Sequence, residues 1–440
     1  MSANTSDSIA RELQAAPLET QVRAVHERAV TVSDLVRATR AAIRDHESAL
    51  HAWVALSPDL EAEAASVGTD PGTHPMAGVS VGVKDLIDVA GLPTRAGSPT
   101  TSPDPAPEDA PCVSRLRKLG AVVQGKTITT EFGYFTPGPT TNPHAADHTP
   151  GGSSSGSAAA VGAGTIGLAL GTQTAGSLTR PASYCGAAGM VLAHGAVDLK
   201  GVTGLSPSLD SLGMLTRTVE DLRWAHAAFC GPTARGAAEA APPGRALLWD
   251  GSHLDTLDPA MTALLRRLPA LLGRLDQDVA VLQWDDHVQS LAQDHATVMA
   301  HEAARSLEQE WERCRQDLGA SLRKLLEQGR EIPEAECTAA LIRRDRSRQL
   351  LEEILTPPSY IVGPAALGPA PAGLAATGSP VLSRPWQLLG LPVVVVPGAR
   401  TSSGLPLGVQ VVGRPGREGQ LLDIAHGLEH LLRQQPSIPD

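Results

Sequence analysis

The sequence predicts an α/β fold, and three observations support that class. Val79, Val81 and Val83 alternate with small and polar residues, which is the two-residue period of a strand. Residues 109–120 then carry apolar side chains at helical spacing and end in glycine, and residues 121–124 form another short apolar run. Because strand, helix and strand follow one another, we expect parallel strand pairs in one sheet.

Further elements follow from similar patterns before and after this unit. Thr31 and Asp34 are spaced as a capping box at the start of an amphipathic helix. Residues 158–170 indicate an alanine-rich helix that leads into a short apolar stretch. The remaining expected elements are charged helices over residues 302–329 and 334–354, a buried strand over 393–396 and a closing helix over 421–432.

Composition excludes several classes of protein. The 440 residues carry a formal net charge of −11, which argues against a nucleic-acid partner, because that partner requires a basic surface. No apolar run approaches the roughly 18 residues of a membrane span, and the N-terminus lacks a signal-peptide pattern, so we expect no membrane partner. The five cysteines form no CxxC pair, which predicts no disulfide framework, no zinc site and a reduced, cytoplasmic compartment.

The most unusual stretch runs from residue 149 to residue 189 and is dense in Gly, Ser, Thr and Ala. Glycine at this density indicates positive φ angles or a close approach of the backbone to another group. The stretch contains a serine cluster at residues 153–155 and a second serine, Ser177, after a predicted turn over residues 171–176. This turn presents Ser177 directly after several backbone N–H groups, so we expect a functional site here.

This stretch resembles the amidase signature family. The sequence GGSSSG at residues 151–156 and the sequence GTQTAGSLTRPA at residues 171–182 match the two ends of the family pattern. Ser153 and Ser177 also stand 24 residues apart, as in the family.

Two further parts of the family pattern lie outside this stretch. Lys84, in the segment GVSVGVKD at residues 78–85, matches the lysine of the family's Ser–Ser–Lys triad. Residues 390–392 and 404–413 resemble the family's closing motifs. Because four separated motifs appear in the family's order, the resemblance is specific, and it covers roughly residues 30–230 and 355–430.

The resemblance implies a single amidase domain over residues 1–440, although the length alone favours two or three domains. The implied fold is the amidase-signature fold, with a large mixed and mostly parallel sheet that helices cover on both faces. The expected parts are an N-terminal helical segment at residues 1–60, the signature core at 61–230, a variable helical insert at 231–355, and C-terminal strands and a helix at 356–440.

The resemblance also implies amide hydrolysis through an acyl-serine intermediate, with neither metal nor cofactor. It assigns Ser177 as the nucleophile, Lys84 as the base, and Ser153, held by a cis peptide bond, as the relay between them. Lys84 accepts a proton only if its pKa is lowered, which burial without a carboxylate partner achieves. Strand alternation predicts that the side chain of the next residue, Asp85, points away from Lys84. The expected oxyanion hole consists of four consecutive backbone N–H groups, those of Thr174, Ala175, Gly176 and Ser177.

The expected substrate is a small-molecule amide, with Arg180, Ser154 and Gly152 as candidate contacts. Arg180 matches an arginine of malonamidase-type members, which suggests a clamp on a substrate carboxylate, but a structural pairing near Pro181 explains it equally well. Ala175 stands where the family most often has glycine, and its β-carbon restricts φ. Two alternative functions remain, a glutaminase subunit of an amidotransferase and a binding protein without activity. A homodimer is one expected assembly.

Other motifs in the chain have structural interpretations. Residues 120–127 satisfy the P-loop expression, but the residues between its glycines are the expected strand itself. Ser154 lies in a G-x-S-x-G sequence, but no apolar strand precedes it as in a nucleophile elbow. Ser321 and Lys324 form an S-x-x-K pair on a charged helix without the motifs that accompany it in penicillin-binding proteins. Two histidine pairs lack a third metal ligand: His144 with His148, and His426 with His430.

Overall fold

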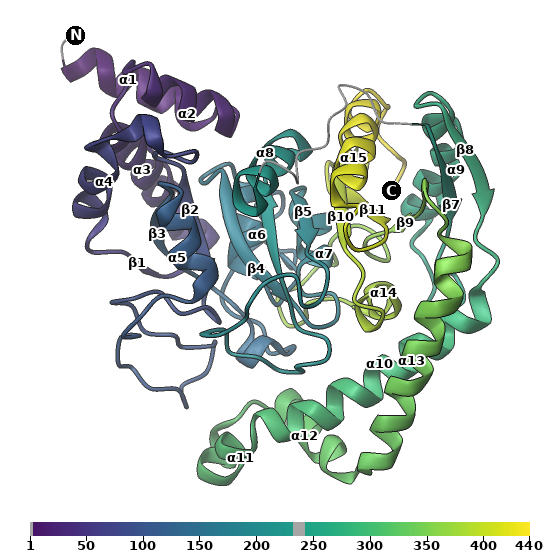
Figure 1. The fold of residues 1–440 in the computed structure, drawn as a ribbon. Helices are drawn as coiled ribbons and strands as arrows, with labels where there is room; N and C mark the ends of the chain where they lie inside the picture. The colour runs from purple at the N-terminus through teal and green to yellow at the C-terminus, as the bar shows by residue number, and fades with distance from the viewer. Residues whose placement is uncertain (1–2, 232–242) are drawn as a thin grey trace.

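Strands from all parts of the chain join one eleven-stranded sheet (Figure 1). The computed structural model describes residues 3–231 and 243–440. The strands are β1 Trp53–Leu56, β2 Ser80–Lys84, β3 Val122–Thr127, β4 Leu168–Gln173, β5 Ala188–Val191, β6 Ser211–Thr216, β7 Gly244–Leu248, β8 Gln277–Val281, β9 Ser359–Pro364, β10 Val393–Arg400 and β11 Pro406–Val412. Their order across the sheet is β1-β3-β2-β4-β6-β5-β10-β11-β9-β7-β8.

The sheet is mixed, with more antiparallel than parallel pairs. β2 pairs in parallel with β3 and β4, and β7 pairs in parallel with β8 and β9. The other six pairs between the described strands are antiparallel. The prediction of a large mixed sheet is therefore confirmed, but the expectation that it is mostly parallel needs correction. Short connections, such as residues 401–405 between β10 and β11, allow only an antiparallel return of the chain.

α-Helices cover both faces of the sheet (Figure 1). They are α1 Ala3–Gln14, α2 Leu18–His26, α3 Val32–Leu50, α4 Leu60–Gly68, α5 Pro111–Lys118, α6 Ser155–Gly162, α7 Thr179–Cys185, α8 Val219–Cys230, α9 Pro259–Gly273, α10 Asp285–Ser306, α11 Glu308–Cys314, α12 Ala320–Glu331, α13 Glu334–Ile354, α14 Arg384–Leu388 and α15 Glu418–Arg433. None of these described helices combines the length and the apolar character that a membrane span requires.

Alternation along the strands divides the core into two layers. Val394 and Val396 of β10 pack in the layer that contains side chains of α8, α9 and α15. Val393 and Val395 of the same strand pack in the layer that contains side chains of α6, α7 and α10. The second layer is rich in alanine, because α6, with the sequence SGSAAAVG, lies against the sheet at short range. A β-carbon on Gly156 of α6 would stand only 2.5 Å from the backbone nitrogen of Ile128.

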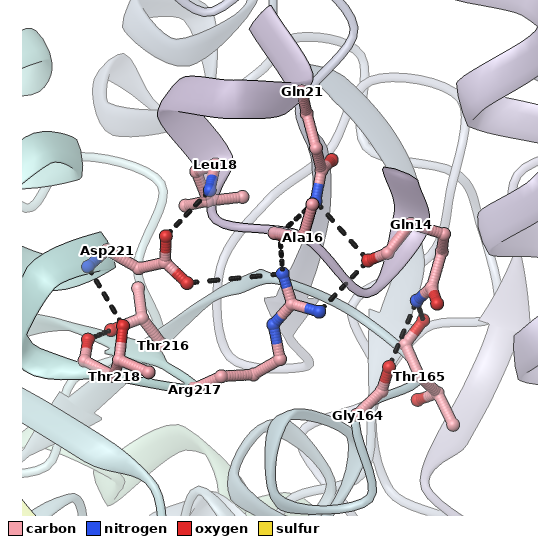
Figure 2. A network of polar contacts seen from close by, with 10 residues as sticks. All are labelled: Gln14, Ala16, Leu18, Gln21, Gly164, Thr165, Thr216, Arg217, Thr218 and Asp221. Atoms are coloured by element: carbon pink, nitrogen blue, oxygen red, sulfur yellow. Dashed lines mark hydrogen bonds and ion pairs between the residues drawn. The ribbon is translucent and has the colours of Figure 1, made fainter. Parts of the chain in front are cut away.

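A polar network attaches the first two helices to the core (Figure 2). At the turn between α1 and α2, Arg217 donates to the carbonyl oxygens of Gln14 at 2.9 Å and Ala16 at 2.6 Å. The backbone nitrogen of Leu18 donates to Asp221 at 2.7 Å. Arg217 precedes α8 and Asp221 lies within it, so this turn is anchored at the start of a core helix.

The predicted helices are largely present, with one clear difference. Thr31 and Asp34 form the predicted capping box at the start of α3. The helix predicted over residues 334–354 is α13, whereas the helix predicted over residues 302–329 is divided among α10, α11 and α12. The segment predicted as a helical insert also adds two strands, β7 and β8, to the sheet. We call α10 to α13, residues 285–354, the helical arm; Figure 1 shows it in green, extending below the sheet.

Candidate active site

Lys84 is the last residue of β2, which lies between β3 and β4 in the sheet. Its side chain is fully buried. The nitrogen Nζ lies 2.7 Å from Ser153 Oγ and 2.7 Å from Thr172 Oγ1, and 3.3 Å from the Thr172 carbonyl oxygen. Within the described chain, the amine therefore meets hydroxyl and carbonyl oxygens and no carboxylate.

Burial lowers the pKa of Lys84 to about 7, and the charge of Asp210 opposes part of this shift. The neighbouring carboxylate, Asp85, pairs instead with Lys126 at 3.0 Å. Asp85 therefore points away from Lys84, as the strand alternation predicts. With a pKa of about 7, Lys84 is about half neutral at neutral pH and largely neutral above it, and a neutral amine can accept a proton.

Ser153 stands at the end of a glycine-containing loop, just before α6. The peptide bond between Gly152 and Ser153 is cis, as the resemblance implies. Gly152 has no room for a side chain, because a β-carbon there would stand 2.9 Å from Thr377 Cγ2 and 3.0 Å from Thr130 Cγ2. The tight packing of this loop holds the Ser153 hydroxyl against Lys84.

Ser177 lies in the turn between β4 and α7 and is nearly buried. Its carbonyl oxygen accepts a hydrogen bond from the backbone nitrogen of Ser154 at 2.9 Å, which joins the two predicted loops. Among the residues that the structure describes, the hydroxyl of Ser177 has no hydrogen-bond partner, Ser153 included. The structure therefore shows the Lys84–Ser153 contact of the predicted relay, and no hydrogen bond between the described side chains of Ser153 and Ser177.

The turn that ends at Ser177 contains four consecutive buried backbone donors. The N–H groups of residues 174–177 have no acceptor in the described part of the chain. Buried backbone N–H groups are almost always paired, so four free donors in one turn are unusual. They form a ready site for an oxygen that carries negative charge. Ala175 does not adopt a positive φ, so its β-carbon is compatible with the backbone of the turn.

Gln173 fixes the end of this row of donors. Its Oε1 accepts from the backbone nitrogens of Leu178 and Thr179, both at 3.0 Å. Its Nε2 donates at 3.0 Å to Gln387 of α14, which in turn donates to the Gln173 carbonyl oxygen at 3.1 Å. Sequence reasoning did not identify Gln387, because it lies 214 residues further along the chain and belongs to no motif of its own.

Comparison with known proteins assigns the family. The family model named Amidase matches residues 34–252, which include Lys84, Ser153 and Ser177. The protein AmiA2 of Mycobacterium tuberculosis strain H37Rv, whose name places it among the amidases, is 31% identical over 443 residues and aligns with 91% of this chain and 90% of its own. The chain belongs to the amidase family.

Further matches extend over nearly the whole amidase. A glutamyl-tRNA(Gln) amidotransferase subunit of Anaeromyxobacter dehalogenans is 30% identical over 487 residues, which cover 98% of this chain and 99% of that protein. A crystal structure of an amidase superposes with a TM-score of 0.83 at 28% identity, covering 94% of this chain and 99% of the other. The peptide amidase of Stenotrophomonas maltophilia, at 23% identity, shares the fold with a TM-score of 0.78 over 96% of this chain and 98% of its own. The predicted family, fold and enzyme class are thus confirmed.

A cavity of about 260 Å³ adjoins Ser153 in this amidase. Its walls are mainly apolar, and the loop between β5 and β6 supplies much of them, including Leu199, Val202 and Leu205. Thr174 and Asp210 add polar atoms to the lining. The volume and the apolar walls fit a small substrate group beside the Ser153 hydroxyl.

Asp210 organises the loop that lines this cavity. Its Oδ2 accepts from the backbone nitrogens of Leu205 at 2.8 Å and Ser206 at 2.9 Å. Its Oδ1 accepts from the hydroxyl of Thr174 at 2.5 Å. Burial raises the pKa of Asp210 to about 6. Sequence reasoning gave Asp210 no role, although it is the acidic group whose charge acts on Lys84.

Arg180 lies in α7 and is almost fully buried. Its Nη2 donates to the Gly152 carbonyl oxygen at 2.7 Å and to Thr377 Oγ1 at 3.1 Å. Its Nε and Nη1 have no partner within the described chain, and the guanidinium lies 5.9 Å from the centre of the Phe135 ring. Burial lowers the pKa of Arg180 to about 10. Arg180 therefore supports the peptide before Ser153, while its contact with a substrate stays a prediction.

The other two predicted substrate contacts occupy structural positions. Ser154 is fully buried, and its hydroxyl donates to the Thr172 carbonyl oxygen at 3.2 Å. Gly152 offers its carbonyl oxygen to Arg180. Their contacts with a substrate also stay predictions. The burial of Ser154 is unlike a nucleophile elbow, in which the serine hydroxyl is exposed.

The remaining motifs take structural positions. Lys126 of the P-loop-like segment is fully buried and is paired with Asp85 rather than open to a phosphate. Ser321 and Lys324 are exposed on α12. In the described residues, no group of three or more His, Cys, Asp or Glu side chains is arranged to hold a metal ion.

Proposed function

We propose that this amidase hydrolyses a small-molecule carboxamide through an acyl intermediate on Ser177. The proposal rests on one observation above all, the buried contact of 2.7 Å between Lys84 Nζ and Ser153 Oγ. Burial of an amine without a carboxylate partner is costly in a purely structural core. The same environment is what a lysine needs in order to act as a base.

The order of the three groups gives the reaction. Neutral Lys84 takes the proton of Ser153, and Ser153 takes the proton of Ser177 as Ser177 Oγ bonds to the amide carbon. A proton returned along this relay reaches the amide nitrogen as the C–N bond breaks, and the amine or ammonia leaves. Water is then activated by the same relay, attacks the acyl group and releases the acid and the free Ser177.

The free N–H groups of residues 174–177 stabilise the negative oxygen that develops during both steps. Donors that the fold already holds in place need no reorganisation during the reaction. Removing one such donor from an oxyanion hole typically lowers kcat by about 10²–10³-fold. The proposed hole therefore provides a large share of the rate acceleration.

Covalent labelling tests the assignment of the nucleophile. A fluorophosphonate should modify the wild-type protein on Ser177, as located by mass spectrometry, and Ser177→Ala should abolish both labelling and turnover. Ser154→Ala is the matched control, because Ser154 is a buried serine in the adjoining loop. A label on Ser154 would contradict the proposal and favour a nucleophile elbow.

The acyl side of the substrate is a second part of the proposal. Two nitrogens of Arg180, Nε and Nη1, have no hydrogen-bond partner in the described chain, which supports a preference for a carboxylate on the acyl side. A desolvated pair of this kind contributes about 1.5–3 kcal/mol, or roughly ten- to a hundredfold in selectivity. Malonamate-like amides should therefore exceed neutral amides of equal size in kcat/KM, and Arg180→Ala should remove the preference. If wild type and Arg180→Ala show the same ratio of kcat/KM for malonamate-like over neutral amides, Arg180 has only a structural role.

A glutaminase subunit of an amidotransferase is the second candidate, because the match to the Anaeromyxobacter dehalogenans protein covers nearly the full length of both chains. Affinity capture from the native source, followed by size determination, distinguishes a lone enzyme or homodimer from a hetero-complex. A partner protein together with glutamine-dependent ammonia release would favour this second candidate. Absence of turnover on a panel of primary amides and on glutamine would favour a binding protein without activity.

A further inference from the structure

The helical arm reaches the proposed oxyanion hole through His295 of α10. The imidazole ring is fully buried, and its Nε2 lies 2.8 Å from the carbonyl oxygen of Thr174. Because a carbonyl oxygen only accepts hydrogen bonds, Nε2 must carry a proton. Nδ1 has no partner in the described chain. Burial and the nearby charge of Arg384 lower the pKa of His295 to about 3, so the ring is neutral at ordinary pH.

The Thr174 carbonyl and the Ala175 N–H belong to one peptide unit. The cis peptide bonds of the described chain are at Gly152–Ser153 and Pro357–Pro358, so this unit is trans. In a planar trans peptide the C=O and N–H bonds point in opposite directions. A donor that holds the carbonyl oxygen on one side therefore fixes where the N–H points on the other side. That N–H is one of the four free donors of the proposed hole.

We propose that His295 is a positioning residue that aims the Ala175 N–H at the substrate oxygen. This inference rests on the proposed acyl-serine reaction. It assigns to the helical arm a part in catalysis that the signature motifs do not contain, since α10 lies beyond residues 34–252 matched by the family model.

A second contact of the same helix supports this role. Glu302 lies seven residues after His295 and accepts hydrogen bonds from Ser206 Oγ at 2.6 Å and from the nitrogen and hydroxyl of Ser208 at 2.9 and 2.6 Å. This is the loop whose Asp210 holds the Thr174 hydroxyl. α10 therefore bonds the Thr174 carbonyl oxygen directly through His295. Through Glu302 it also holds the loop whose Asp210 accepts from the Thr174 hydroxyl.

Two substitutions of His295 separate positioning from packing. His295→Leu keeps an apolar side chain but removes the donor, whereas His295→Gln keeps an N–H at a similar reach. We expect His295→Leu to lower kcat by roughly ten- to a hundredfold, with KM changed by less than about threefold, because losing a positioner should cost less than losing a donor outright. His295→Gln should restore most of kcat. The ratio of the wild-type kcat to the His295→Leu kcat should stay constant from pH 6 to pH 9, because His295 does not titrate there.

His287→Leu is the matched control, because His287 lies on the same helix but bonds Ser347 of α13 at 2.7 Å, away from the site. It should leave kcat unchanged, and melting temperatures of all variants report any loss of packing. If His295→Leu does not fold, His295→Asn replaces it, because its amide is too short to reach the carbonyl.

Three results would overturn the inference: a wild-type kcat in the variant without the donor, no rescue by His295→Gln at equal melting temperature, or an effect confined to KM. Turnover by Ser177→Ala would instead overturn the proposed function. If Ser177→Ala is inactive while His295→Leu keeps full kcat, only the role of His295 fails.

Discussion

The signature core and the helical arm shape the same site by different means. In the core, residues 149–189 are almost entirely buried, and the site consists largely of backbone and short hydroxyl side chains. The arm is long and charged, and it reaches the site through side chains such as His295 and Glu302. A site made by tightly packed backbone requires glycine and serine at fixed positions, and such positions can be recognised as a sequence motif. A single functional side chain on an amphipathic helix produces no such motif.

The largest effect should come from the proton relay of the core. Ser177→Ala and Lys84→Ala should each lower kcat by about 10⁴-fold or more, because members of one relay act as a unit. Ser153→Ala should be severe but less complete, since a water molecule can occupy part of the space of the missing hydroxyl. Steady-state kinetics, with circular dichroism to confirm folding, measures this. A Lys84→Ala protein within tenfold of wild type would show that the core supplies no base.

The pH dependence should follow the environment of Lys84. Protonation removes the base, so kcat/KM should fall as pH drops through about 7, the lowered pKa of Lys84, and should level off at higher pH. Asp210→Asn removes the negative charge that favours the protonated amine, so the fall should move to lower pH. Glu108→Gln, an exposed acid paired with Lys200, is the control and should leave the profile unchanged. An unshifted profile in Asp210→Asn would contradict the coupling.

Close packing inside the arm should matter for activity as well as for stability. A β-carbon on Gly329 of α12 would stand 1.8 Å from the backbone oxygen of Ala300 in α10, so Gly329→Ala must displace one helix. We expect about 1–3 kcal/mol of destabilisation, and a several-fold lower kcat because α10 carries His295. Gly273→Ala is the control, since its β-carbon would meet no atom within 4 Å. Denaturant unfolding and kcat are measured on the same variants. A destabilised Gly329→Ala protein with full kcat would show that packing within the arm does not affect catalysis.

The smallest effect on catalysis should come from a cap outside both regions. Thr31→Ala removes the side-chain acceptor for the Asp34 nitrogen at the start of α3. The expected cost is about 1 kcal/mol of unfolding free energy. Because α3 contributes no group to the site, kcat should not change. A lower kcat would mean that the N-terminal helices, as well as the core and the arm, shape the site.

Much of the candidate site was predictable because its chemistry is local in sequence. Strand alternation placed the Lys84 and Asp85 side chains apart, and the structure shows Asp85 paired with Lys126. The glycines and serines of residues 149–189 predicted a tight site, since only small residues allow such close contacts as that of Gly152 with Thr377. The capping box of α3 was equally local.

What the tertiary structure decided involves partners distant in sequence and strand directions. The pKa of Lys84 depends on burial and on Asp210, which belongs to the loop that lines the cavity. Gln387 and His295 hold the turn before Ser177 from 214 and 121 residues away. The mainly antiparallel pairing also depends on which strands become neighbours. A sequence pattern records the period of an element and its local turns, whereas these contacts exist only after the elements have packed.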